Sequence, residues 1–454
     1  MKTLPTFRRY EPNQLLLLPP DMTDWLPADH LVYFVRDVVK QLDLSGIYDC
    51  YDGSQGGYPP YHPEMMVCLL IYAYCLGVAS SRQIEKATYE SVPFRVLTAD
   101  QHPDHDTISE FRRRHLKELG TLFFQVLRLC RKAGLVKLGH VSLDGTKVHA
   151  NASKHKAMSY GRMQKSEQEL EAEVRRLLKE AEWKDKEEDQ RYGKGRRGDE
   201  LPEELRFKAS RLAKIREAKE ALEQAARRET QQRQAELEKK DDWDRRGRPP
   251  KLPSGEPDPK AQRNFTDPDS RIMKDGATKS FEQCYNCQVA VDGASQIIVA
   301  TGVTQEANDK RQLKPLLETL KRNLHKKPKQ VSGDSGYFSE DNISFLGTER
   351  IDGYIATGRI KHTSKVTGCP RGRIPQTATI KDRMARKLQT IHGRLRYGRR
   401  KGIVEPVFGQ IKHARKFRQF LLRGIDKITS EWDLICLGHN LLKLFRSGWR
   451  PANA

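Results

Sequence analysis

The chain has 454 residues, and its 82 Lys and Arg against 60 Asp and Glu give a formal net charge of +22. This length allows two or three domains and at least one large core. So strongly basic a soluble protein is expected to bind a polyanion, most commonly nucleic acid. The longest apolar run, at 65–79, is short for a membrane span, and the N-terminal segment has no apolar stretch typical of a secretory signal. We therefore expect a cytoplasmic protein without a membrane partner, whose eight cysteines are free thiols.

Residues 1–135 are predicted to form a helical N-terminal domain. In "DHDTISEFRRRHL", Thr107 and Glu110 have the spacing of a capping box at a helix start. Three consecutive arginines, 112–114, follow in the same predicted helix. Two interpretations remain open: a helix-turn-helix that binds DNA, or a helical bundle whose arginines are merely solvated.

A charged segment, residues 161–245, interrupts the chain after its first predicted strand. Residues 165–245 hold 22 Lys and Arg and 23 Asp and Glu, with apolar residues at helical spacing. This pattern predicts long antiparallel helices or a coiled coil, and its near-zero net charge indicates that the polyanion binds elsewhere. An extended basic linker, 246–265, comes next, and its Arg246 and Arg248 resemble the core of an AT-hook, which binds the DNA minor groove.

The remaining segments, 136–160 and 266–454, predict one α/β domain. "HVSLDG" suits a first strand, and the chain after residue 280 continues as strand, strand, helix, strand, helix, strand and helix. This is the element order of a ribonuclease-H-like catalytic domain, here with a helical N-terminal domain and a long charged helical insert after the first strand. We expect the helix of "IVEPVFGQIKHARKF" to begin near residue 403 and a buried helix to close the chain.

Two aspartates occupy equivalent positions in this predicted domain. Asp144 and Asp334 each come at the end of a strand that runs into a glycine. In a ribonuclease-H-like fold these strands lie side by side, so both carboxylates project from one edge of the sheet. Neighbouring carboxylates repel each other unless a cation lies between them, and Mg²⁺ prefers oxygen ligands. Two such ions can stabilise the attacking and leaving oxygens of a phosphoryl transfer.

A third acid stands out because its surroundings are basic. Residues 359–423 contain 19 Lys and Arg but only two acids, Asp382 and Glu405. Glu405 precedes Pro406, which suits the first turn of a helix, and Lys412 lies on the same helical face. Taken alone, a glutamate favoured by the helix dipole explains this pattern. Together with the two aspartates, a metal ligand surrounded by phosphate-binding bases explains it better.

Three segments together resemble a known family, the DDE transposases of bacterial insertion sequences, in the IS-eleven-eighty-two group. "LDGTKVHANASK" resembles the segment that bears the family's first aspartate, "GDSGY" resembles its second motif, and "VEPVFGQIK" resembles its third. The resemblance covers nearly the whole chain. It implies a bacterial, nucleoid-associated protein that acts on double-stranded DNA.

The signature of the related broader group, Tyr-x2-Arg-x3-Glu-x6-Lys, is only partly kept. Glu405 and Lys412 have the Glu-x6-Lys spacing. Tyr397 lies one residue too far from Glu405, and Lys401 occupies the arginine position, with Arg400 beside it. The insert also differs, since some relatives interrupt the fold just before the glutamate helix.

The resemblance implies a catalytic mechanism and a set of site residues. Asp144, Asp334 and Glu405 would coordinate two Mg²⁺ ions, with Mn²⁺ as a substitute, and the same site would cut the element ends and join them to target DNA. No covalent protein–DNA intermediate is needed, so Tyr397 is a contact residue. Since two ends must be brought together, a homodimer is expected in the DNA complex. The expected DNA-binding residues are Tyr397, Arg400, Lys401, Lys412, Arg415, Arg246 and Arg248.

Other acids and other functions compete with this interpretation. Asp267, Asp269, Asp292 and Asp309 are predicted to be turn or cap residues and are left outside the catalytic set. One alternative function is a metal-dependent nuclease of the same fold that never joins strands. Another is a regulatory or catalytically inactive DNA-binding protein derived from a transposase, against which the complete acid trio argues.

Overall fold

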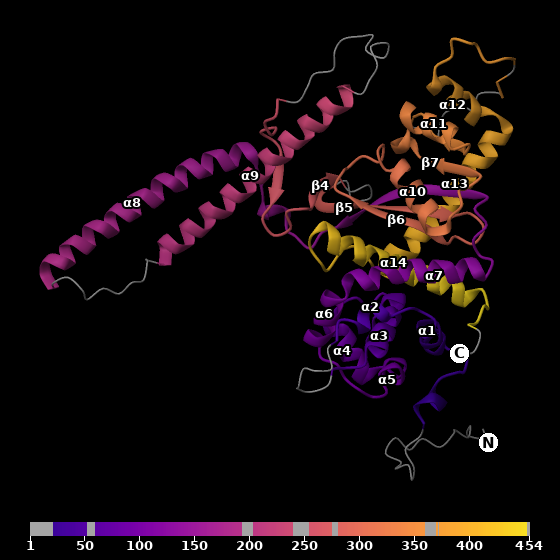
Figure 1. Ribbon diagram of the computed structural model, residues 1–454, viewed down its shortest axis with the longest axis horizontal. Helices are drawn as coiled ribbons and strands as arrows, with labels where there is room; N and C mark the ends of the chain where they lie inside the picture. Colours follow the sequence, from indigo (N-terminus) through magenta and orange to yellow (C-terminus); the bar gives the residue numbers. More distant parts are fainter. Residues whose placement is uncertain are drawn as a thin grey trace, which may run out of the picture.

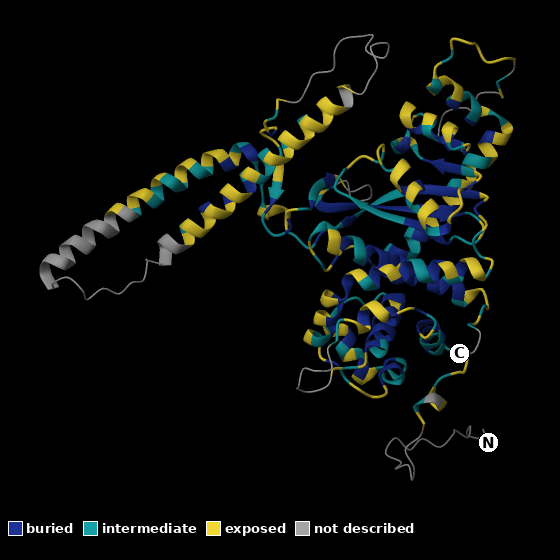
Figure 2. Cartoon of the chain, in the orientation of Figure 1, coloured by how far each residue is buried: buried dark blue, intermediate teal, exposed yellow. Residues whose placement is uncertain are grey.

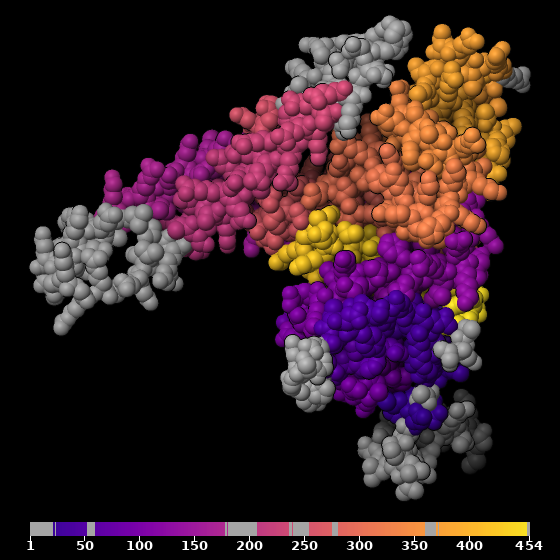
Figure 3. All heavy atoms as spheres, viewed as in Figure 1, coloured from indigo at the N-terminus to yellow at the C-terminus, as the bar shows by residue number. Residues whose placement is uncertain are grey.

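A computed structural model describes residues 21–51, 60–192, 203–238, 254–274, 280–358, 369–370 and 372–451. Figure 1 shows a helical N-terminal region, a mixed sheet with its covering helices, and a long helical arm that projects from one side. The space-filling view in Figure 3 shows the same arm standing out from the rest of the molecule. The linker arginines Arg246 and Arg248 lie outside the described residues.

The N-terminal region consists of one short 3-10 helix and seven α-helices. Its longest apolar helix, α3, is buried along most of its length because the other helices surround it. Among the described residues no single helix has the length and apolar character to cross a membrane, although the bent pair α3 and α4, at 99° to each other, has them together. The elements are η1 (Met22–Trp25), α1 (Leu31–Val39), α2 (Ser45–Tyr48), α3 (Pro63–Leu76), α4 (Ser81–Glu90), α5 (Val92–Thr98), α6 (His105–Arg114) and α7 (Leu116–Lys132).

The capping residue of α6 differs from the prediction. Helix α6 begins at His105, and the side chain of Asp104 accepts a hydrogen bond from the Thr107 N–H at 2.6 Å. Asp104 is therefore the N-cap, and Thr107 lies inside the first turn. The capping-box prediction was wrong because an equally good capping residue stands three positions earlier.

The three arginines of α6 have partners within the N-terminal region. Arg112 is only 5% exposed and donates to the Ala79 carbonyl at 2.7 Å. Arg113 pairs with Glu110, and Arg114 donates to the Cys50 carbonyl. These contacts favour the helical-bundle interpretation over a DNA-reading helix with free arginines.

The sheet has the strand arrangement expected of the predicted fold class. Its order is β4-β5-β1-β7-β8, with β6 also paired to β5. β5 is antiparallel to β1 and β6, whereas β7 is parallel to β1 and β8. The strands are β1 (His140–His149), β4 (Arg271–Lys274), β5 (Phe281–Asp292), β6 (Ile298–Thr304), β7 (Gln330–Gly333) and β8 (Asp352–Ile355), and the predicted mixed α/β class with a helical N-terminal region is confirmed.

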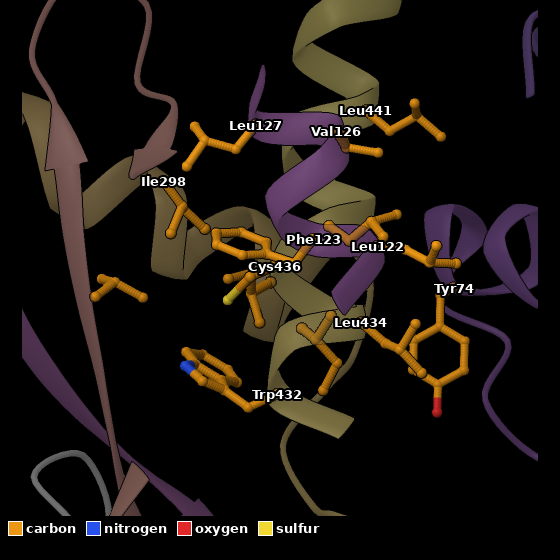
Figure 4. Close-up of a cluster of buried hydrophobic side chains, with 14 of the residues drawn as sticks. Tyr74, Leu122, Phe123, Val126, Leu127, Ile298, Trp432, Leu434, Cys436 and Leu441 are labelled. Atoms are coloured by element: carbon orange, nitrogen blue, oxygen red, sulfur yellow. The ribbon is translucent and has the colours of Figure 1, made fainter. Parts of the chain in front are cut away.

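Helices cover this sheet and join it to the N-terminal region. α10 packs on β6 and β5, and α13 crosses β1, β7 and β8. α14 lies between the sheet and α7, and Figure 4 shows Phe123 of α7 meeting the side chains around Trp432 and Cys436 of α14. All eight cysteines are free, as predicted. The helices are α10 (Leu313–Leu324), α11 (Glu340–Thr348), α12 (Ile380–Gln389), α13 (Ile391–Gly409) and α14 (Ile425–Arg446).

The start of α13 was predicted wrongly. The helix begins at Ile391, where the Thr390 side chain accepts a hydrogen bond from the Gly393 N–H, and it continues through Pro406. A proline inside a helix leaves the carbonyl four residues earlier without its usual donor. Here that carbonyl, on Gly402, accepts a 2.8 Å hydrogen bond from the Gln296 side chain. A distant residue thus makes the internal proline tolerable.

The arm consists of α8 (Tyr160–Tyr192) and α9 (Glu203–Glu238), which pack against each other. At its base, Met163, Ile215 and Ala218 form a small buried cluster of their own. Beyond the base, the described side chains are mostly exposed, as Figure 2 shows. A two-stranded sheet of β2 (Ala157–Ser159) and β3 (Gln262–Asn264) joins the arm to the main body.

Candidate active site

Asp144 and Asp334 come together because their strands run side by side. β1 and β7 are parallel, and Ser142 pairs with Ser332 in their register. Each aspartate lies two residues beyond that pair, at the point where β7 has ended. β1 itself continues to His149, so Asp144 lies within its strand and not at the strand end that was predicted. The two carboxylates nevertheless share one edge of the parallel pair.

Asp144 occupies a largely buried position in which its negative charge is unfavourable. Burial raises the pKa of Asp144 to about 6, the neighbouring charges of Asp334 and Asp309 add to this rise, and Arg400 opposes it. The Arg400 guanidinium approaches Asp144 Oδ2 at 3.2 Å. Asp334 is oriented by its own turn, since its Oδ1 accepts a hydrogen bond from the Gly336 N–H at 2.9 Å.

Arg400 supplies positive charge to this site, and Tyr397 lies beside it on α13. The Arg400 side chain is 12% exposed, and its guanidinium lies 6.0 Å from the centre of the Tyr397 ring. The two residues keep the Tyr-x2-Arg spacing of the signature. Arg400, one residue before the position that the signature predicts from Glu405, contacts the aspartate, while Lys401 is exposed. In this structure Arg400 balances an acid instead of presenting itself to DNA.

Glu405 lies on α13 beyond Arg400 and is exposed. Within the described parts of the chain it forms no hydrogen bond or ion pair. Its companion Lys412 follows in a short π-helical turn, η5 (Gln410–Ala414), and donates to the Lys147 carbonyl of β1 at 2.6 Å. Glu405 therefore lies on the helix that packs on β1, and no hydrogen bond or ion pair among the described residues engages its carboxylate.

The fold brings a further acid, Asp309, to this site, although its sequence pattern predicts only a turn or cap residue. Asp309 follows β6, and its Oδ1 accepts hydrogen bonds from Asn286 at 2.7 Å and from Gln288 at 2.6 Å. Both amides come from β5 and are fully buried. Two polar amides at alternating positions of a buried strand were a signal that an acid or another polar partner would face them.

These side chains suit a hard divalent cation by their chemistry. Carboxylate oxygens are the ligands that Mg²⁺ and Mn²⁺ prefer, and a cation would relieve the repulsion among the three aspartates. Within the ranges that the structure describes, no group of three or more His, Cys, Asp or Glu side chains is placed so that together they could hold a metal ion. The residues that could hold such an ion are Asp144 and Asp334, with Asp309 as the nearby acid of the loop before α10. Glu405 is the acid that α13 contributes on the helix beyond Arg400.

Not every predicted DNA contact is accessible. Arg415 is only 4% exposed, and its guanidinium donates to the Ile435 carbonyl at 2.9 Å. Burial lowers the pKa of Arg415 to about 10. A side chain in the core between η5 and α14 has no route to a DNA backbone, so its position speaks against the predicted contact.

A basic groove lies beside the opposite ends of the same strands. It has a volume of about 670 Å³ and no acid in its lining. Gly398 and Gly402 leave the surface of α13 open there, because nothing lies within 4 Å of the position a Cβ would take. Its basic residues are Lys137, Lys329, Arg396 and Arg399. Four bases without an acid form a surface suited to phosphate groups.

The other predicted turn acids have structural roles. Asp267 is fully buried and accepts hydrogen bonds from the Tyr285 hydroxyl at 2.9 Å and the Gly424 N–H at 3.2 Å. Asp269 accepts from the Ile425 N–H at 3.0 Å. The hydrogen bonds of Asp267 and Asp269 therefore connect the start of α14 to strand β5 of the sheet. Asp292 accepts from the Leu138 N–H before β1 and from the Ala294 N–H in the turn after β5, so the structural role predicted for these three acids is confirmed.

Two family models match parts of the chain. Residues 254–441 match the family model of the transposase DDE domain, and residues 20–114 match that of the transposase domain (DUF772). The first match includes Asp334 and Glu405, whereas Asp144 lies before it. No curated protein and no solved structure matches the chain. The two matches support a DDE transposase, and the strand order agrees with the ribonuclease-H-like fold that a DDE domain implies.

Proposed function

We propose that this protein is an insertion-sequence transposase that cuts DNA at the ends of its element and joins them to target DNA. The observation that carries this proposal is the meeting of Asp144 and Asp334 at one edge of a parallel strand pair, inside a chain with two transposase domains. We also assign it to the IS-eleven-eighty-two group and to the cytoplasm of a bacterium, on the resemblance of its three acidic segments.

In this proposal Asp144, Asp334 and Glu405 hold the divalent cations, Mg²⁺ or Mn²⁺. A cation bound there supplies electrostatic stabilisation to the attacking and leaving oxygens of the phosphodiester. Arg400 holds Asp144 in position before DNA binds, and the basic groove beside α13 binds the phosphate backbone. The scissile phosphate then lies against the edge of the sheet where the acids gather.

The proposal is tested by nicking of supercoiled DNA that carries the native flanking sequence, with Mg²⁺ or Mn²⁺. We expect Glu405→Gln to reduce cleavage on the order of a hundredfold or more, because it removes a metal ligand. Asp382→Asn is the matched control, since Asp382 is the other acid of the same basic stretch and only caps α12.

Three results would change the proposal. Equal cleavage by wild type and Glu405→Gln would remove Glu405 from the site and leave the two aspartates as its centre. DNA binding without cleavage by either protein would favour an inactive DNA-binding protein derived from a transposase. Cleavage without joining in a strand-transfer assay would favour a nuclease of the same fold.

A further inference from the structure

We propose that Asp309 is an additional cation ligand of the active site, held in place by two buried amides of β5. This inference rests on the proposed function, because it adds a residue to the metal site of Asp144 and Asp334. It also revises the sequence-based expectation that Asp309 only caps a helix or shapes a turn.

The contacts of Asp309 exclude a helix-capping role. α10 begins at Leu313 with Gln312 in the cap position, and no side chain caps it. The Asp309 carboxylate turns the other way, toward the sheet, where Oδ1 accepts from Asn286 and Gln288. Both of these amides are fully buried. Burying a polar amide costs free energy unless it forms hydrogen bonds, and here both amides donate to the same carboxylate oxygen and orient Asp309.

The second oxygen of Asp309 faces the other acids. A Cβ added to Gly336 would lie 3.1 Å from Asp309 Oδ2 and 3.0 Å from Asp334 Oδ1, so both carboxylates approach the same point. A Cβ added to Gly145 would lie 2.8 Å from Asp309 Oδ1. Asp309 thus lies between the glycines that follow Asp144 and Asp334, and within the described residues its Oδ2 accepts no hydrogen bond.

A buried relay joins Asp309 to the turn of Asp334. Gln288 donates to Asp309 through Nε2 and accepts, through Oε1, a hydrogen bond from the Tyr337 hydroxyl. Tyr337 is fully buried and ends the short helix that Asp334 caps. One glutamine therefore fixes the positions of both acids relative to each other.

The repulsion among these carboxylates would be relieved by a bound cation. The carboxylates of Asp144, Asp309 and Asp334 lie close enough to repel each other. Among the described bases, Arg400 pairs with Asp144, and the positive charge of Lys147 interacts with Asp309. In metal sites of proteins, hydrogen bonds from neighbouring residues typically orient the side chains that bind the ion. The hydrogen bonds to Oδ1 leave Oδ2 of Asp309 as the oxygen available for the ion.

The first test measures Mn²⁺ binding to the full-length protein without DNA, by electron paramagnetic resonance of free Mn²⁺. Asp309→Asn keeps the carbonyl oxygen that accepts from Asn286 and Gln288 but removes the charge at the second oxygen. We expect it to weaken Mn²⁺ binding about tenfold or more. Glu306→Gln, on the same loop and paired only with Arg311, should bind Mn²⁺ like the wild type.

The second test needs no variant. Fe²⁺ with ascorbate cuts a polypeptide backbone close to where the ion is bound, and we expect cuts in residues 305–312 of the wild type as well as near Asp144 and Asp334. Absence of cuts in 305–312 would overturn the inference even if Asp309→Asn failed to fold.

The outcomes separate the inference from the proposed function. If Asp334→Asn loses Mn²⁺ and Asp309→Asn binds it like the wild type, Asp309 is not a ligand, and the transposase proposal stands. If the wild type itself binds no Mn²⁺ and cuts no DNA, the proposed function fails and the inference fails with it.

Discussion

Arg400 and its neighbour Arg399 lie in different surroundings: Arg400 contacts Asp144 of the active site, whereas Arg399 faces the basic groove. The Arg400 guanidinium lies 3.2 Å from Asp144, and both side chains are largely buried. Arg399 is exposed and lines the basic groove. Neighbouring arginines on one helix thus have different surroundings, and their substitutions should have different effects.

We expect Arg400→Gln to destabilise the metal-free protein by about 1–3 kcal/mol, because Asp144 would lose its charged hydrogen-bond donor while staying buried. Arg399→Gln should leave stability unchanged and weaken binding of DNA, with a reduced dependence on salt. Urea unfolding and DNA binding at two salt concentrations measure both effects. Equal loss of stability in the two variants would show that the contact with Asp144 contributes nothing.

Asp433 is a second buried acid, in the core and away from the active site. Among the described residues, the Thr301 hydroxyl alone donates to its side chain, at 2.6 Å, and burial raises the pKa of Asp433 to about 7. The unfolded chain releases this proton near pH 4, whereas the folded protein keeps it until about pH 7. The free energy of unfolding should therefore fall as the pH rises from about 4 to 7.

We expect Asp433→Asn to remove this fall and to exceed the wild type in stability at pH 8 by up to about 4 kcal/mol, from about three pKa units at about 1.4 kcal/mol each. At pH 4 the two proteins should be equally stable. Asp426→Asn, in the exposed first turn of the same helix, is the control and should show no such difference. A gain that is the same at both pH values would contradict the assignment to Asp433.

At the scale of elements, the junction between α3 and η5 depends on one glycine. Gly77 ends α3 with a φ of +81°, and a Cβ there would collide with the backbone carbonyl of Arg415. Gly134, after α7, has a similar φ of +76° but open space around it. Substitutions at Gly77 and Gly134 therefore distinguish two contributions to the free energy of unfolding: the strain of a left-handed conformation and the collision of a Cβ with a neighbouring backbone.

We expect Gly134→Ala to destabilise the protein by about 1 kcal/mol, the cost of a positive φ for a residue with a Cβ. Gly77→Ala should cost at least about 2 kcal/mol more, because the helix end must move away from η5. Thermal and urea unfolding compare the two. If both substitutions cost the same, the close approach of the two chain segments is not a constraint on stability.

The strands were easier to predict than the helix that carries Glu405. "HVSLDG" and "QVSGD" have the apolar pattern of strands, and a parallel pairing follows from their place in the fold class. α13 starts twelve residues before the predicted point, since Pro406 suits the first turn of a helix. The contact of Gln296 with Gly402 removes that boundary, and no local pattern could reveal it.

At the scale of the whole molecule, the arm is the part without a packing partner. Its distal helices hold together by ion pairs such as Glu173 with Lys208 at 2.7 Å, and the Phe207 side chain is 71% exposed. Such a surface is available for a second copy of the chain. We therefore propose that the arm contributes to the homodimer expected on paired element ends.

Replacing residues 176–207 by a short Gly-Ser linker should remove the distal arm and keep its base at Met163 and Ile215. We expect this protein to bind and cut single DNA ends like the wild type but to form no dimer on paired-end DNA. Light scattering of the DNA complexes measures the change. A wild-type monomer on paired ends, or an unchanged dimer after the deletion, would contradict this role of the arm.

The sequence by itself determined the class of the molecule: its net charge, the helical and strand patterns, and two aspartates at equivalent strand positions. These properties depend on composition and local periodicity, so they are present in the order of residues. The tertiary structure decided which acids and bases meet: Arg400 pairs with Asp144, Arg415 is buried, and Asp309 joins the site. Contacts between residues far apart in the chain depend on how elements pack, and packing, not spacing, determines which side chains share one edge of the sheet.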